Sequence, residues 1–381
     1  MSWFRRKRKP TEPKNADEPC TLPREVVDAC MSYLSGRTRD LKACSLVCKV
    51  WSHAAQHILF NTVFLTQSMS KYSRLGKALQ RSPHLITHIH TLTLHRDDRV
   101  KTSMFESICM QPFTHLDTVT IVHSNPMDIA TAHVLGQLLS LRTLRRVDMD
   151  CYFLEPTIFP VIWETCSPTV KHLDLRTCSG TLDPIPSLVH TAASKPVMLD
   201  SLRLGRSNNI DVWMAPESSP FDYSRLFILS LETSQAFSRW PRVTPNRHTI
   251  ESLDFSAHGS VGVDLSLFPN LQFLRIHSIS ALSAGKVRNC LITITPACRI
   301  QQIVLRLDLP RVYMCEQMDF QIVKLPMSQL PSVGIETVDV EYDYWALHFP
   351  KLRARELLHR TNPNWFETRI ERRDAILRRP P

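Results

Sequence analysis

Residues 21–60 read TLPREVVDACMSYLSGRTRDLKACSLVCKVWSHAAQHILF, which is too apolar to be exposed on every side. Between Leu41 and Gln56 the polar side chains form a single narrow stripe, so this part predicts a helix that is apolar around most of its circumference. About 40 residues cannot form a core large enough to cover such a helix. The cover must therefore come from a partner or from the rest of the chain. The stripe consists of Lys42, Ser45, Lys49, Ser52 and Gln56.

A second apolar face precedes this stripe. Pro23 stands where the first turn of a helix accepts a proline. Apolar residues then recur at helical spacing, so the segment predicts two short amphipathic helices. An ordinary helical hairpin that caps the following domain is the plainer alternative, although a cap has no need of apolar residues on two opposite faces. The recurring residues are Val26, Val27, Cys30, Met31 and Leu34.

Together these residues resemble an F-box. The pattern of that family appears here as Leu22-Pro23-x-Glu25, Leu34, Asp40-Leu41 and Val47-Cys48-Lys49-Val50-Trp51, with a slightly long loop at 35–39. The resemblance covers about a tenth of the chain. It implies a three-helix unit that docks on the Skp-type adaptor of a cullin ubiquitin ligase, while the remainder captures a substrate. The residues implied to contact the adaptor, or to brace the helices that do, are Leu22, Pro23, Val27, Cys30, Met31, Leu34, Leu41, Val47, Cys48 and Trp51.

Composition predicts a soluble intracellular protein, cytoplasmic or nuclear or both. Of the 381 residues 43% are hydrophobic, which is enough for an extensive core. The charged segment WFRRKRKP is not followed by an apolar run, so the 11 cysteines are expected to be reduced. No window offers 18 uninterrupted apolar residues, so no transmembrane helix and no membrane partner are predicted.

The net charge of +10 lies mostly in the tails, 1–18 and 369–381. What remains over the middle is too small for a phosphate-binding stripe, so nucleic acid is not an expected partner. Arg6 to Lys9 fit a nuclear import signal and fit a solvated tail equally well. The tails, 1–18 and the residues beyond Arg378, are predicted to be disordered.

From residue 60 to residue 345 an apolar-x-x-apolar-x-apolar pattern recurs ten times. The pattern alone would arise often by chance, but its spacing of 21 to 35 residues, mostly in or near the 20–29 period of leucine-rich repeats, is too even for that. The matches are Ile89/Leu92/Leu94, Leu116/Val119/Ile121, Leu144/Val147/Met149, Val170/Leu173/Leu175, Leu199/Leu202/Leu204, Leu226/Leu229/Leu231, Ile250/Leu253/Phe255, Leu271/Leu274/Ile276, Ile300/Ile303/Leu305 and Ile335/Val338/Val340.

Each match predicts a short strand with one buried face, and helix-like stretches such as His133–Leu141 and Ile158–Cys166 follow some of them. Cys178 fits the family's ninth position and Asn125 lies one residue off, so the array resembles a divergent leucine-rich repeat of the kind found in fungal F-box proteins. The expected fold is α/β: a three-helix F-box, then a right-handed leucine-rich-repeat solenoid with a parallel sheet on its concave face. The expected domains are a basic tail (1–20), the F-box (21–60), the solenoid (61–345) and a helical cap with a basic tail (346–381).

Strand alternation predicts that the polar residues between the apolar ones form an exposed, charged concave face that binds the substrate. A solvated face whose charges only keep it soluble is an equally good interpretation. The mixed signs favour a protein partner over nucleic acid. The proposed substrate-binding residues are Asp148, His172, Asp174, Arg176, Arg203, Asp254, Arg275, His277 and Arg306; Arg146, Asp150, Asp339 and Glu341 extend the face.

No catalytic or cofactor motif is present. The G-x-S-x-G, G-x-x-x-x-G-K and H-E-x-x-H patterns are missing, so no catalytic residue, no cofactor and no metal are assigned. Cys44 and Cys48 have ligand spacing but no second pair, and buried packing is the better interpretation. His88 and His90, near His84 and His95, are expected on an exposed strand face rather than at a zinc site. A terminal cap is expected from Tyr342, Tyr344, Trp345 and Phe349.

The sequence therefore predicts a non-catalytic substrate-recognition adaptor of an SCF-type ubiquitin ligase. Its partners would be the Skp-type adaptor, through it a cullin, and a protein substrate. Two alternatives remain open: an F-box scaffold that acts without ubiquitin transfer, and an enzyme with an unrecognised site.

Overall fold

A computed structural model describes residues 22–66, 68–97, 99–151, 158–178, 196–205, 220–232, 247–257, 263–279, 283–307, 312–325, 331–337, 349–360 and 365–377. The chain divides into two compact units, Met1–Thr62 and Val63–Pro381. The predicted disordered tails lie outside the described residues. So do Val338, Val340, Asp339 and Glu341, and the predicted cap residues Tyr342, Tyr344 and Trp345.

The first unit consists of α1 (Arg24–Tyr33), α2 (Thr38–Cys44) and α3 (Lys49–Asn61). Its small core is formed by Val27, Met31, Leu41, Ala54 and Ala55, with half-buried Leu34, Cys44, Trp51, Ile58 and Leu59 around it. The three helices implied by the F-box resemblance thus share one core, and each helix helps to cover it.

The single helix predicted over 41–56 is wrong, because the chain turns between α2 and α3. The Ser45 hydroxyl donates a hydrogen bond of 2.7 Å to the Lys42 carbonyl, and Ser45 ends α2. Cys48 is fully extended, with φ −157° and ψ 172°. A serine that bonds to the backbone competes with the helical hydrogen-bond pattern, which the apolar periodicity does not register.

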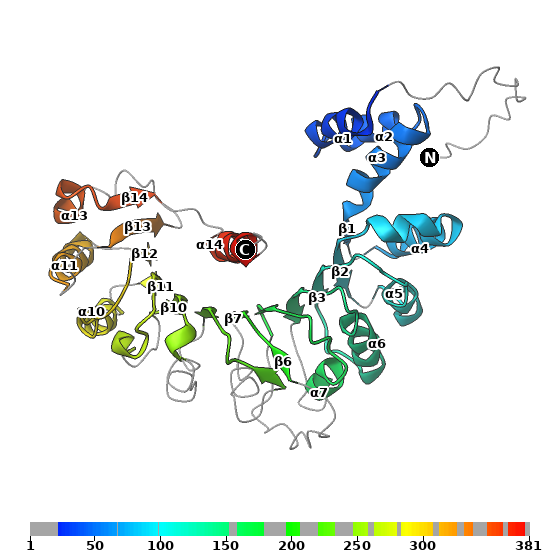
Figure 1. Ribbon diagram of the computed structural model, residues 1–381. Helices are drawn as coiled ribbons and strands as arrows, with labels where there is room; N and C mark the ends of the chain where they lie inside the picture. The colour runs from blue at the N-terminus through cyan, green and yellow to red at the C-terminus, as the bar shows by residue number, and fades with distance from the viewer. Residues whose placement is uncertain are drawn as a thin grey trace, which may run out of the picture. The chain divides into compact units, whose positions relative to one another are not determined.

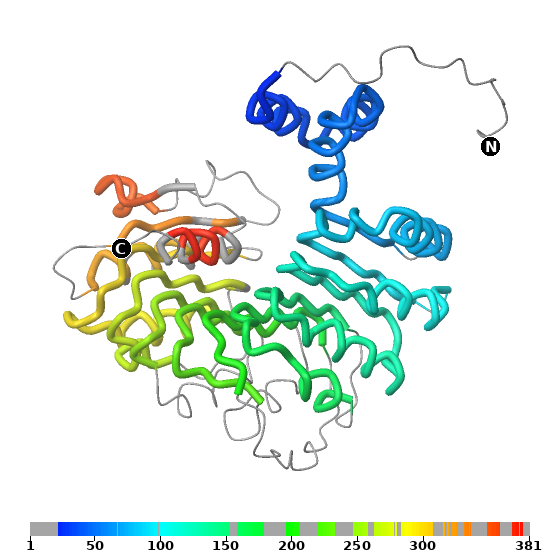
Figure 2. Tube along the Cα trace, turned by 45° about the vertical axis from the view of Figure 1, so that its right-hand side comes forward, coloured from blue at the N-terminus to red at the C-terminus, as the bar shows by residue number. Residues whose placement is uncertain are grey.

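In the second unit a twelve-stranded sheet follows the order of the chain (Figures 1 and 2). From β2 onward, successive strands pair in parallel, which confirms the predicted parallel sheet. The strands are β1 (Thr62–Leu65), β2 (Thr91–Arg96), β3 (Thr118–His123), β4 (Arg146–Cys151), β5 (His172–Leu175), β7 (Ser201–Leu204), β9 (Ile228–Leu231), β10 (Ser252–Ser256), β11 (Phe273–Ile279), β12 (Gln302–Leu307), β13 (Ser332–Thr337) and β14 (Leu358–Arg360).

The apolar residues of the repeats line up across the strands. One continuous row runs through Leu92, Val119, Val147, Leu173, Leu202, Leu229, Leu253, Leu274 and Ile303. These are the fourth positions of the first nine predicted repeats, and all are almost fully buried. The tenth is wrong, because Val333 and not Val338 pairs with Ile303. The separation between Ile303 and Val333 is closer to the usual repeat length than the separation between Ile303 and Val338.

One face of the sheet is covered by a layer of helices (Figure 1). This helical layer contributes fully buried side chains of its own, such as Phe105 of α5 and Phe159 of α7. Its members are α4 (Met69–Arg81), α5 (Thr102–Cys109), α6 (Ile129–Leu139), α7 (Ile158–Trp163), α10 (Ala284–Ile292), α11 (Val312–Val323) and α13 (Pro350–Ala354), with the 3-10 turns η1 (Pro83–His88), η2 (Arg247–Thr249) and η3 (Leu265–Leu267).

A small two-stranded sheet of β6 (Val197–Met198) and β8 (Phe221–Asp222) lies on the same side as the helical layer. The Phe221 ring packs edge-on against Trp163 of α7, with ring centroids 5.2 Å apart. The two-stranded sheet therefore packs beside α7 of the helical layer.

The opposite face, which we call the inner face, carries α14 (Trp365–Leu377) (Figure 1). In β2 and β3 residues alternate between buried and half-exposed, as in a strand with one open face. In β5, β9 and β10 every residue is buried. The inner face is therefore open near the start of the sheet and covered farther along it.

Candidate interaction surfaces

The first unit exposes several large apolar side chains. They lie just before α1, within α1, in the turn between α2 and α3, and in the first turn of α3. Leu46 is 86% exposed and Val47 64% exposed, because the break between α2 and α3 places both in the turn. Large exposed apolar groups concentrated in a small unit mark a protein interaction site. The set, which we call the apolar patch, is Leu22, Val26, Tyr33, Leu46, Val47 and Val50.

The ten predicted adaptor-binding residues divide into three groups. Leu22, Pro23, Cys30 and Val47 are exposed; Leu34, Cys48 and Trp51 are half-buried; Val27, Met31 and Leu41 are in the core of the unit. The first group is available for contact, and the last can only brace the helices. The exposed side chains of Val26, Tyr33, Leu46 and Val50 were not predicted, although Val50 belongs to the Val47-Cys48-Lys49-Val50-Trp51 motif and Leu46 directly precedes it.

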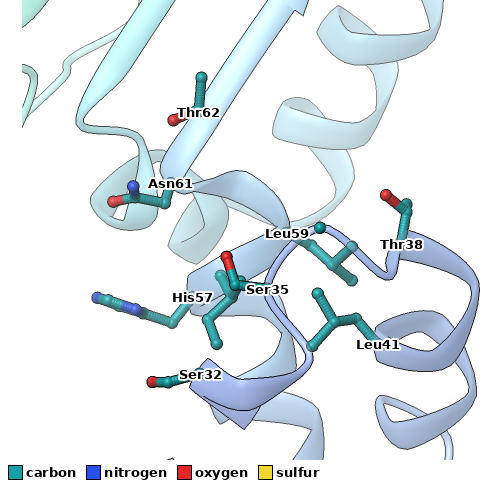
Figure 3. Close-up of a pocket in the computed structure, with 10 residues that line it drawn as sticks. Ser32, Ser35, Thr38, Leu41, His57, Leu59, Asn61 and Thr62 are labelled. Atoms are coloured by element: carbon teal, nitrogen blue, oxygen red, sulfur yellow. The ribbon is translucent and has the colours of Figure 1, made fainter. Parts of the chain in front are cut away.

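The first unit also contains a hollow of about 560 Å³ (Figure 3). Small polar side chains such as Ser32, Ser35 and Thr38 line it together with Leu41, which belongs to the core. His57 is the one titratable residue among those that line it.

The metal-site candidates are held apart. Within the described ranges, no group of three or more His, Cys, Asp or Glu side chains could hold a metal ion. His88 does not lie on a strand face as predicted: it ends η1 and is buried. His90 stacks on His115 with ring centroids 5.8 Å apart. Cys44 ends α2 and Cys48 precedes α3, and both are half-buried.

The charged residues of the inner face pair with one another along one strand, between neighbouring strands and, for Arg275 of β11 and Glu336 of β13, across the strand between them. Asp174 of β5 accepts a 3.0 Å hydrogen bond from Arg176 and lies 3.8 Å from Arg203 of β7. Arg203 in turn reaches Glu232 at 2.6 Å. Farther along, Arg275 of β11 lies 3.5 Å from Asp254 and 2.5 Å from Glu336. Opposite charges on adjacent strands form a ladder of ion pairs.

This ladder corrects the prediction of an exposed charged face. Arg176 remains well exposed, and Arg203 and Arg306 are half-buried. The other predicted substrate-binding residues are buried: Asp148, His172, Asp174, Asp254, Arg275 and His277. Alternation along a strand assigns side chains to a face, but it does not say whether that face meets solvent.

Burial raises the pKa of the Asp174 carboxyl to about 6, against the opposing effect of Arg203 and Arg176. The unfolded chain binds this proton less tightly, with a pKa of about 4. The stability contributed by protonated Asp174 is therefore fully present below about pH 4 and is lost as the pH rises through about 6.

The variant Asp174→Asn removes this titration. We expect the free energy of unfolding of the wild type, relative to that of Asp174→Asn, to fall by about 2–3 kcal/mol between pH 4 and pH 7. Urea unfolding at a series of pH values measures the difference. A difference that grows with pH would show that the two arginines outweigh burial.

A comparison with known protein families matches residues 19–66 to the F-box-like family. No curated protein matches the chain. The match covers α1, α2, α3 and β1, and with them the whole apolar patch. The chain thus has an F-box-like domain, which indicates a role as an adaptor in protein interactions. Among the described helices, none combines the length and the apolar character needed to cross a membrane.

Proposed function

We propose that this chain is the substrate-recognition adaptor of an SCF-type E3 ubiquitin ligase. Its F-box-like domain would dock on a Skp-type adaptor and, through it, join a cullin. The observation that carries the proposal is the apolar patch within residues 19–66, since six large apolar side chains stay exposed in a domain whose family typically binds such adaptors.

The second unit would hold the substrate. We propose that its sheet is a right-handed leucine-rich-repeat solenoid, because strands in chain order with a connection on one side are typical of stacked repeats. Such arrays present extended surfaces to protein partners. Its work would be binding, without catalysis of its own.

We place the protein in the cytoplasm, the nucleus or both. Its ten described cysteines form no disulfides, and Cys109 and Cys290 are buried among apolar groups that raise the pKa of each thiol. Buried thiols of this kind act as small apolar residues in a reducing compartment.

Affinity purification of the tagged full chain, followed by mass spectrometry, tests the proposal. We expect recovery of a Skp-type adaptor and a cullin. Recovery of the adaptor without a cullin would favour the scaffold that acts without ubiquitin transfer. Recovery of neither, from cells that contain both, would overturn the proposed function.

A further inference from the structure

Among the described side chains of helix α14, that of Ile370 is the buried aliphatic anchor on the inner face. Ile370 is 4% exposed and packs among Ile228 of β9, Phe273 of β11 and Val304 of β12. The helix therefore packs on strands from distant parts of the chain. Burial of an isoleucine in this way is worth about 1.5–3 kcal/mol.

Two polar contacts fix the direction of α14 on the sheet. The Arg369 guanidinium stacks over the Phe273 ring, 4.3 Å from its centroid, and donates a 3.1 Å hydrogen bond to the side-chain oxygen of Gln302. One turn later, the Asp374 carboxylate lies 3.5 Å from Nε2 of His172 on β5. One basic, one aliphatic and one acidic residue of α14 thus each contact a different set of residues on the inner face.

The sheet is adapted to this helix. Strand pairing places Thr91, Thr118, Arg146, His172, Ser201, Ile228, Ser252, Phe273 and Gln302 in one row of the inner face. The next row runs through Thr93, Thr120, Asp148, Asp174, Arg203, Ser230, Asp254, Arg275 and Val304.

Both rows are polar except at Ile228, Phe273 and Val304, the three residues that surround Ile370. Apolar residues that cluster on an otherwise polar face are stabilised when another element removes them from water. The inner face therefore contains an apolar seat, bordered by polar groups, on which the Ile370 side chain packs. A helix that presents a basic, an aliphatic and an acidic side chain at the spacing found in α14 would fit this part of the inner face.

The described side chains of α14 hold it on the sheet through one apolar anchor and a few polar contacts. The helix has 13 residues, and helices of that length are marginal in water without packing. Glu371, Arg372 and Ala375 on its other side are exposed. An element held through one apolar anchor and a few polar contacts opens at low cost compared with the core of the sheet.

We propose that the inner face from β5 to β12 is a helix-binding groove, filled by α14 in the free chain and taken by the substrate in competition with α14. The substrate segment would be an amphipathic helix with a basic residue directly before an aliphatic one and an acidic residue four positions after it. This inference rests on the proposed function, since it names the class of substrate that the second unit captures.

A labelled peptide of residues 363–379 serves as the probe in a test with the full chain. Fluorescence anisotropy compares its binding to the wild type, to Ile370→Asp and to the matched control Ala375→Asp, which adds the same charge on the exposed side of α14. We expect Ile370→Asp to bind the peptide at least about tenfold more tightly than the wild type, because the groove is then vacated. Ala375→Asp should change binding by less than about threefold.

A second variant keeps the test decisive. This variant adds Ile228→Ser to Ile370→Asp, because serine occupies the paired positions on both neighbouring strands. The apolar anchor site of the groove is then lost, and peptide binding should fall back to the wild-type level. A peptide with Ile370→Asp should not bind any chain. Circular dichroism melting shows which variants are folded.

Equal peptide binding by the folded wild type and the folded Ile370→Asp chain would overturn the inference, as would an equal gain for Ala375→Asp. Pull-down of the Skp-type adaptor separates the two proposals. If the chain binds the adaptor but Ile370→Asp gives no gain in peptide binding, the proposed function is supported and the groove proposal is overturned. A gain in peptide binding without adaptor binding does the reverse.

Discussion

Alanine at both Leu22 and Pro23 is expected to weaken binding of a Skp-type adaptor at least a hundredfold. Leu22 is 45% exposed and Pro23 precedes the first turn of α1, so both are available to a partner. An apolar side chain of this size buried at an interface is worth about 1.5–3 kcal/mol, and about 1.4 kcal/mol is a factor of ten in affinity. Val27 and Met31, which form the core beneath, are untouched.

Calorimetric titration of purified full chain with purified adaptor measures the effect. The matched control is Met110→Ala combined with Ile292→Ala, which removes two similarly exposed apolar side chains from the second unit. That control should bind the adaptor as the wild type does. An unchanged dissociation constant for the Leu22 and Pro23 variant would remove this face from the adaptor interface.

The helices of the first unit could be predicted from apolar spacing, but their boundaries could not. Apolar periodicity predicted one continuous helix through Ser45 and Val47. In the structure, Ser45 caps the C-terminal end of α2, and its side chain bonds to the backbone. That local hydrogen bond is what exposes Leu46 and Val47. The feature that favours an interaction site thus arises where the simple pattern fails.

Most strands of the sheet could be predicted from the sequence because they repeat the same separation of buried residues. Nine strands follow the predicted pattern, yet the strands at its ends were missed. Of these, β1 has four residues and β14 three, too few for alternation to stand out. At β13 two frames of the same apolar pattern compete, and only the pairing of Val333 with Ile303 selects between them.

The cover on the inner face could not be predicted from alternation, because it depends on a helix from a distant part of the sequence. The sequence did contain a signal. Ile228 and Phe273 stand at positions where the neighbouring strands have serine, histidine or glutamine. A comparison of corresponding positions across repeats, in addition to the pattern within each repeat, would have singled out both.

The second large effect is expected from Asp254→Ala, which we predict lowers the free energy of unfolding of the second unit by about 3–5 kcal/mol. The Asp254 side chain is fully buried, accepts a 2.8 Å hydrogen bond from Ser230 and lies 3.5 Å from the Arg275 guanidinium. Its removal leaves a buried arginine with less compensating charge, and desolvation makes that state costly. Urea unfolding measures the change.

Arg99→Ala is the control, because its partner Asp97 lies 4.0 Å away and the Arg99 side chain is 82% exposed. Loss of such a surface pair should cost less than about 1 kcal/mol. Replacing Arg275 by methionine in the Asp254→Ala background should recover part of the stability, since a buried pair removed as a whole costs less than one partner alone. Recovery stays partial because Glu336 then loses its 2.5 Å contact with Arg275. A cost of less than about 1 kcal/mol for Asp254→Ala would mean that water or the remaining ladder compensates Arg275, and the ladder would then have no structural role at this strand.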